Sequence, residues 1–339
     1  MKTGVPGDRM REGRRVWPVT IVAIVASMTA GISAGVAYAS GLEAESTLPG
    51  ARSLTGVPAR EEFRARVKRA RLGSVELAYY ERGSGPPLLL NIGSASTMSE
   101  WDPALLASLA ARRRLIVYDY RGIGLSSRIP AKGLTIETLA DDASALLDHL
   151  GIERADVLGW SLGGFVAQQI AIRHPERVRR LILAGTNPGG ARTVFGPPYA
   201  QEIDSDPDAT DEEILSVNFP RTREGRAAAR AFLDRLEDAA ETGESPLDFT
   251  VPRSGYRAQL GAEERWYESE ANLERLSDLR IPVLVATGRR DLLTPLANSR
   301  LIASRIPGAR LVAFSGAGHA FLFQDYPRFA RLVEEFLHP

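Results

Sequence analysis

The chain has 339 residues, of which 44% are hydrophobic and 25% charged, a composition typical of a globular protein. Its 42 Lys and Arg residues equal its 42 Asp and Glu residues, so it lacks the excess positive charge of a nucleic-acid-binding protein, and we expect no such partner. The absence of cysteine excludes disulfide bonds, thiol catalysis and cysteine-ligated metals.

The N-terminus has the pattern of an export signal. Residues 1–15 carry five basic and two acidic side chains, and residues 16–39 carry no charge and end in Ala37-Tyr38-Ala39. The uncharged stretch is also long enough to span a bilayer, which takes roughly 20 residues. Residues 1–39 are therefore interpreted as a signal peptide cleaved after Ala39 or, alternatively, an uncleaved anchor. Both readings predict an exported protein (periplasmic, cell-surface or secreted), with membrane contact only through residues 16–39 if these remain attached.

Strand-like and helix-like segments alternate after a linker at residues 40–60, which is rich in Gly, Pro, Ser and Thr. Short apolar runs predict strands, and segments with one apolar face predict helices. The predicted strands are two within 67–85, then 86–93, 114–120, 155–160 and 178–185; the predicted helices are 101–113, 135–150 and one ending at His174. Such alternation predicts an α/β protein with a mostly parallel central sheet and helices on both faces.

The alternation is interrupted between residues 191 and 275, where an acidic stretch precedes helical segments. It resumes with predicted strands at 281–288 and 309–316 and helices at 294–305 and 326–337. The sequence thus predicts a core formed by residues 61–190 and 276–339, with residues 191–275 inserted as a helical cap. We place this cap over the carboxyl ends of the strands, where open α/β sheets bind their ligands.

The segment "VLGWSLGGFVAQQ", residues 157–169, places Ser161 between a predicted strand and a predicted helix. A sharp turn there would expose the hydroxyl, but it would require small residues two positions before and after, and these are Gly159 and Gly163. The pattern predicts an activated serine nucleophile, whereas the alternative is a glycine-rich turn with an incidental serine. Trp160 is expected to pack in the core behind the turn.

Two later residues have the properties of partners for Ser161. His319 lies in "SGAGHAF", in a glycine-flanked loop after a predicted strand, and Asp291 follows another strand in "ATGRRD". Asp291 could instead cap the next helix. His149 and His174 fall within and at the end of predicted helices, and His338 lies one residue from the C-terminus, so His319 is the strongest candidate base.

These motifs together resemble the α/β-hydrolase superfamily over residues 65–339. The resemblance rests on the elbow "GWSLGG", on "GRRD", "GAGH" and "DYRGIGLSS", and on the chain order Ser, Asp, His. The chain is most similar to the small esterase and lactonase-like branch, whose members have a helical cap.

The resemblance implies a role for each site residue. Ser161 would attack an acyl carbonyl, His319 would carry the proton, and Asp291 would orient the imidazole. The oxyanion would be held by the backbone N–H of Leu162 and by a second N–H, that of Ser94 or, failing that, of Gly93. Members of the superfamily often carry His-Gly in this loop, whereas this chain has Ile92-Gly93.

We therefore expect a serine hydrolase that acts on a small or medium carboxylic ester and uses neither a metal nor an organic cofactor. Alternatives on the same triad are a lactonase, a carbon–carbon bond hydrolase and a cofactor-free perhydrolase. A ligand-binding receptor of the same fold is the non-enzymatic alternative.

Mass spectrometry of the protein recovered outside the cytosol tests the N-terminal prediction. Cleavage by a signal peptidase after Ala39 would leave a chain that begins at Ser40. A full-length mass in the membrane fraction would instead identify residues 1–39 as an anchor.

Overall fold

The computed structural model describes residues 64–338. The predicted signal peptide or anchor and the predicted linker at 40–60 lie outside the described residues. Within residues 64–338, no helix combines the length and apolar character needed to cross a membrane.

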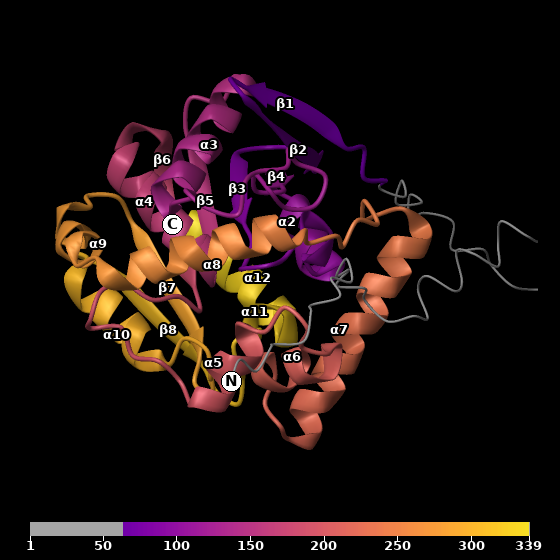
Figure 1. Cartoon of the computed structure of the whole chain (residues 1–339), viewed down its shortest axis with the longest axis vertical. Helices are drawn as coiled ribbons and strands as arrows, with labels where there is room; N and C mark the ends of the chain where they lie inside the picture. Colours follow the sequence, from indigo (N-terminus) through magenta and orange to yellow (C-terminus); the bar gives the residue numbers. More distant parts are fainter. Residues whose placement is uncertain (1–63, 339) are drawn as a thin grey trace, which may run out of the picture.

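A single sheet of eight strands, in the order β1-β2-β4-β3-β5-β6-β7-β8, forms the centre of the molecule (Figure 1). β2 pairs antiparallel with β1 and β4, and all the other pairs are parallel. The strands are β1 (Lys68–Leu72), β2 (Val75–Arg82), β3 (Pro87–Asn91), β4 (Arg114–Tyr118), β5 (Ala155–Trp160), β6 (Val178–Ala184), β7 (Val283–Gly288) and β8 (Arg310–Phe314).

Every residue of β5 and β7 is buried, because helices cover both faces of this sheet. α2 packs against α12, α3 packs against α4, and α10 packs on β7 and β8. The core helices are α2 (Pro103–Ala110), α3 (Ile136–His149), α4 (Leu162–Arg173), α10 (Leu296–Arg305), α11 (Phe321–Gln324) and α12 (Tyr326–Leu337), and the short 3-10 helices are η1 (Met98–Glu100), η2 (Pro175–Arg177) and η3 (Leu276–Asp278). The predicted fold class is confirmed.

The chain between β6 and β7 is helical, as the sequence predicts for a cap. Its helices are α5 (Pro198–Asp204), α6 (Asp211–Asn218), α7 (Arg223–Thr242), α8 (Arg253–Glu268) and α9 (Ala271–Arg275). α7 begins after Thr222, whose side chain accepts a hydrogen bond from Gly225 N, and ends at Gly243 in the left-handed conformation. In Figure 1, α8 crosses in front of the sheet, and α6 and α7 lie together to one side.

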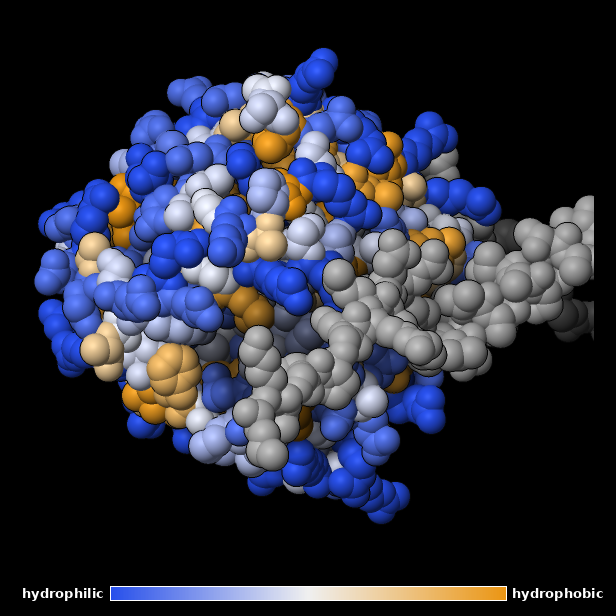
Figure 2. Space-filling view, viewed as in Figure 1, coloured by the Kyte–Doolittle hydropathy of each residue, from blue (hydrophilic) through white to orange (hydrophobic). Residues whose placement is uncertain are grey.

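The face shown in Figure 2 is mostly hydrophilic, and hydrophobic residues appear on it in small separate areas. Among the described residues, the exposed large hydrophobic side chains are Val194, Phe195, Tyr199 and Leu247. Three of these four lie in or beside α5, on the cap rather than on the core.

Candidate active site

Ser161 lies at a strained turn between β5 and α4. Its φ of 56° and ψ of −124° are a conformation that L-residues rarely adopt and that costs roughly 1–3 kcal/mol. The end of β6 holds the turn in place: Ser161 N donates to Ala184 O at 3.0 Å, and Thr186 Oγ1 donates to Ser161 O at 2.9 Å. The strain is therefore fixed by neighbouring backbone, as the elbow pattern predicts.

The glycines that flank the turn are needed because backbone segments approach closely there. A Cβ on Gly159 would overlap the carbonyl group of Gly163, and a Cβ on Gly163 would overlap the carbonyl of Asn91 at the end of β3. The turn consequently packs directly on the neighbouring strand, and the serine is raised above the carboxyl end of the sheet.

His319 lies in the loop after β8, and it contacts Asp291, which lies in the loop after β7. Nδ1 of His319 lies 2.9 Å from Oδ2 and 3.0 Å from Oδ1 of Asp291. The carboxylate is itself oriented, because Oδ1 accepts hydrogen bonds from the N–H groups of Leu293 and Thr294 and Oδ2 accepts one from the Thr294 hydroxyl. Asp291 thus caps the following turn and faces the imidazole as well, which leaves Nε2 of His319 available to the pocket.

Burial and nearby carboxylates act in opposite directions on His319, which is 1% exposed. Burial lowers the pKa of the imidazole, but the charge of Asp291, the hydrogen bond to it and the charge of Asp204 raise it, and the net pKa lies above the usual 6.5. The charges of Asp291 and Asp204 therefore stabilise the imidazolium form.

Trp160 packs in the core, as the sequence predicts, and has a second role as well. Its side chain is 9% exposed, as expected for a core residue, but it also lines the pocket. The indole Nε1 donates to the backbone carbonyl of His319 at 3.1 Å, and the two rings lie 5.3 Å apart. Trp160 thus connects the loop that carries His319 to the turn at Ser161. This contact joins segments that are far apart in the sequence, so the local pattern could not reveal it.

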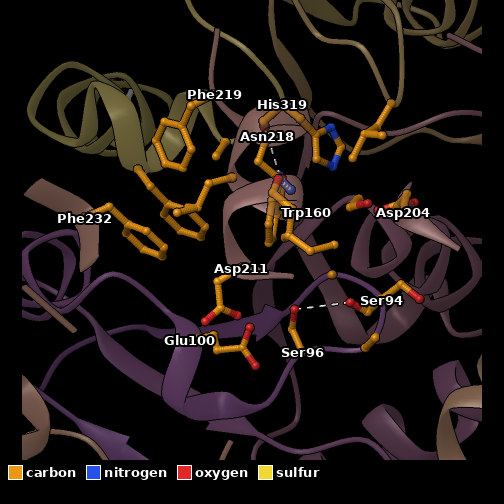
Figure 3. Close-up of a pocket in the computed structure, with 18 of the residues that line it drawn as sticks. Ser94, Ser96, Glu100, Trp160, Asp204, Asp211, Asn218, Phe219, Phe232 and His319 are labelled. Atoms are coloured by element: carbon orange, nitrogen blue, oxygen red, sulfur yellow. Dashed lines mark hydrogen bonds between the residues drawn. The ribbon is translucent and has the colours of Figure 1, made fainter. Parts of the chain in front are cut away.

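A cavity of about 90 Å³ contains the candidate groups (Figure 3). Ser161 and His319 both line it, together with Gly93 and Ser94 of the loop after β3. Within the described residues, no hydrogen bond joins the Ser161 hydroxyl to the His319 ring, and catalytic hydrogen bonds of this kind often tighten only when substrate is bound.

The lining of the cavity combines apolar and acidic side chains. The apolar side chains are mainly those of Phe219, Phe232, Phe249, Phe323, Val251, Leu215 and Ile214. Glu100, Asp204 and Asp211 supply carboxylates, and Glu100 and Asp211 lie beside each other in Figure 3. Among the lining residues that the structure describes there is no lysine or arginine.

The predicted oxyanion donors lie next to Ser161, and their role stays a prediction. Leu162 is the first residue of α4, a position whose N–H has no partner within the helix. The backbone of Gly93 is close to Ser161, because a Cβ on it would lie 3.4 Å from Ser161 Cβ. Both donors therefore come from segments that border the cavity.

Neither the acidic nor the aromatic lining of the cavity was identified from the sequence. Of the aromatic residues in the cap, Phe219, Phe232 and Phe249 line the cavity, whereas Trp266 stacks on Phe165 outside it. Asp204 and Asp211 were visible only as members of an acidic stretch. Their position depends on how α5 and α6 dock, for which the sequence carries no local signal.

The remaining histidines lie elsewhere. His174 Nε2 is 2.8 Å from Asp141 Oδ1, and the His149 ring packs edge-on against Tyr79. Within residues 64–338, no group of three or more His, Asp and Glu side chains is arranged to hold a metal.

Comparisons with known proteins agree with this architecture. A family model described as the alpha/beta hydrolase fold matches residues 86–326. A 2-hydroxymuconate semialdehyde hydrolase from a Pseudomonas species is 33% identical over 267 residues, which cover 76% of this chain and 89% of the relative.

Two solved structures are similar over most of the chain. An alpha/beta hydrolase fold protein from Chitinophaga pinensis is 26% identical, with a TM-score of 0.72 over 81% of this chain and 98% of its own. The enol-lactonase from Burkholderia xenovorans is 27% identical, with a TM-score of 0.65 over 80% of this chain and 100% of its own.

Replacing Gly163 with Ala should destabilise the turn by about 3 kcal/mol, because the new methyl group overlaps the Asn91 carbonyl. The same change at Gly261 in α8, where a Cβ meets nothing closer than 3.7 Å, should stabilise by about 1 kcal/mol through helix propensity. Urea unfolding of both variants measures the difference. Equal stabilities would show that the turn is not tightly packed.

Replacing Asp204 with Asn should move the acid limb of the kcat/KM profile to lower pH. The proposed base must be neutral to accept a proton, and the Asp204 charge raises the pKa of His319, so its removal lets the imidazole deprotonate at lower pH. The wild-type limb should have its midpoint above pH 6.5. Asp206→Asn, in the same acidic stretch but outside the cavity lining, is the control, and an unshifted limb in Asp204→Asn would contradict the assignment.

Proposed function

The chain belongs to the α/β-hydrolase fold family, and from this premise we propose that it is a serine hydrolase that cleaves carboxylic esters through an acyl-enzyme. One observation carries the proposal. Ser161, on a strained turn, and His319, whose Nδ1 is bound to Asp291, line the same cavity. A serine hydroxyl becomes a useful nucleophile only beside a base that a third group orients.

In the acylation step, Ser161 Oγ forms a bond to the carbonyl carbon of the ester and gives its proton to Nε2 of His319. The imidazolium then protonates the leaving alkoxide as the carbon–oxygen bond breaks, which releases the alcohol. Asp291 keeps the ring in the tautomer that carries its proton on Nδ1 and stabilises the transient positive charge.

In the deacylation step, His319 removes a proton from water as the water oxygen bonds to the acyl carbon of the ester on Ser161. The bond between that carbon and Ser161 Oγ then breaks, the imidazolium returns the proton to Oγ, and the acid is released. The tetrahedral intermediates of both steps carry a negative oxygen. We assign its stabilisation to the N–H groups of Leu162 and of Ser94 or Gly93, each such donor being worth about 3 kcal/mol of the barrier.

The cavity supports a small, uncharged acyl group. Its volume of about 90 Å³ is well below the 300–1,000 Å³ of sites that take drug-sized ligands. The phenylalanine side chains offer an apolar surface to the acyl chain. Glu100, Asp204 and Asp211 would repel a substrate that carries its own carboxylate.

The acidic side chains of the cavity favour the proposed ester hydrolysis over carbon–carbon bond hydrolysis. The similar Pseudomonas enzyme is named for 2-hydroxymuconate semialdehyde, a substrate that bears a carboxylate by its chemical name. A carbon–carbon bond hydrolase for such a substrate would gain from a basic group in the cavity, and none lines it among the described residues. A lactonase uses the same chemistry as an esterase and is tested with it, and a perhydrolase would additionally require peroxide and an organic acid.

The test is hydrolysis of nitrophenyl esters from acetate to palmitate by the full chain, with lactones alongside. Short neutral esters should be the best substrates. The kcat/KM for p-nitrophenyl hemisuccinate should be at least about tenfold lower than that for the pentanoate, because its carboxylate would lie near those of Glu100, Asp204 and Asp211. Activity confined to lactones would favour the lactonase alternative. Equal rates for the charged and neutral esters would remove the charge argument.

Ser161→Ala should lower kcat about 10⁴-fold or more, since the residual rate comes from the oxyanion donors alone. Ser277→Ala, at an exposed position, is the matched control. An initial burst of nitrophenol should precede steady turnover in wild type and be absent from Ser161→Ala. A wild-type protein that binds esters without turnover would support the receptor reading.

A further inference from the structure

The loop after β3, residues 93–96, has a conformation that requires support. It carries Gly93 and Ser94, the candidates for the second oxyanion donor. The next residue, Ala95, has a φ of 50°, in the left-handed region that a residue with a side chain seldom adopts. Such a conformation persists only where neighbouring groups hold it.

Two side chains of the cap helix α8 contact this loop. The Ala95 N–H donates to Gln259 Oε1 at 2.8 Å, and the Ser94 hydroxyl donates to Glu263 Oε1 at 2.6 Å. Gln259 is completely buried. The two residues are one helical turn apart and so lie on the same face of α8.

We propose that helix α8 positions the oxyanion loop, with Gln259 and Glu263 as its positioning residues. The inference rests on the proposed function, because it assigns these residues to the donor that would stabilise the acyl-transfer intermediate. Gln259 fixes the backbone at Ala95, and Glu263 fixes Ser94 itself. The Ser94 N–H, which directly precedes both anchors along the chain, is thereby aimed by the cap, not by the core alone.

Glu263 places a carboxyl group beside the loop that is proposed to bind a negatively charged oxygen, so the protonation state of this group matters. The pKa of Glu263 is raised to about 8, mainly by burial and also by the charge of Asp204 of α5, while hydrogen bonds with Ser94 and with Tyr267 of α8 act in the opposite direction. At neutral pH the carboxyl group is therefore mostly uncharged and can accept from Ser94 without repelling an oxyanion. Above pH 8 it ionises, and a negative charge then faces the loop.

The first test compares variants of Gln259 in the full chain, using nitrophenyl acetate turnover and the rate of inactivation by a nitrophenyl phosphonate, which mimics the tetrahedral intermediate. Gln259→Leu keeps the side-chain size but removes the acceptor. It should lower kcat and the inactivation rate at least about tenfold while KM changes less than twofold, because only transition-state stabilisation is lost. Gln259→Glu restores an acceptor and should recover part of the loss at the pH values where its buried carboxyl group is neutral.

Glu264→Gln, on the exposed side of α8, is the matched control for these variants and should behave as wild type. A folded Gln259→Leu protein with an unchanged inactivation rate would overturn the inference. So would equal losses in kcat and in substrate affinity, which would indicate a general disturbance of the cavity.

The second test uses pH and holds even where Gln259→Leu does not fold. Wild-type kcat should decline above pH 8 as Glu263 ionises, whereas Glu263→Gln, which stays neutral, should keep its rate there. Persistence of the same alkaline decline in Glu263→Gln would contradict the role of Glu263.

Phosphonate labelling distinguishes failure of the proposed hydrolase function from failure of the positioning role of α8. If the phosphonate does not label Ser161 in wild type, the proposed function fails and the inference falls with it. If it labels wild type and the α8 variants equally fast, the hydrolase proposal stands and the positioning role is wrong.

Discussion

The structure depends on one backbone constraint, the strained turn at Ser161. The turn can form only because two glycines let α4 and β3 approach closely, and it persists because β6 holds the serine's N–H and carbonyl. The strain costs roughly 1–3 kcal/mol, and the packing of the fully buried strand β5 offsets it. The hydroxyl is therefore fixed relative to three neighbouring strands, β3, β5 and β6, and the loops that follow β7 and β8 bring Asp291 and His319 to the same edge.

Core and cap contribute different parts of the site. The core supplies Ser161, His319 and Asp291, the proposed nucleophile, base and orienting acid, from the ends of parallel strands, where rigid pairing fixes their geometry. The cap supplies most of the apolar lining, the carboxylates of Asp204 and Asp211, and the contacts of α8 with the proposed oxyanion loop. Changes in cap sequence can thus alter substrate choice while the proposed triad stays in place.

The core could be predicted from the sequence because its signals are local. Apolar runs marked the buried strands, Gly159 and Gly163 marked the turn, and a strand preceded both Asp291 and His319. The cap contacts could not be predicted in this way. Gln259 and Glu263 appear in the sequence as ordinary polar residues of a helix, and only the docking of α8 brings them into contact with the loop after β3. The burial of Trp160 was predicted, but its contact with His319 was not, since His319 is 159 positions further along the chain.

The arrangement of charge matches the two charges that would develop during the proposed acyl transfer. The imidazolium would form beside Asp291 and within the field of Asp204, both of which favour it. The oxyanion would form on the opposite side of the nucleophile, where an ionised carboxylate would raise the barrier. Asp204 also raises the pKa of Glu263, so the same charge that favours the imidazolium helps to keep the carboxyl group beside the oxyanion loop neutral. An acidic cavity is in this way compatible with an anionic intermediate, because the ionised carboxylate acts on the cationic partner and the neutral carboxyl group adjoins the anionic one.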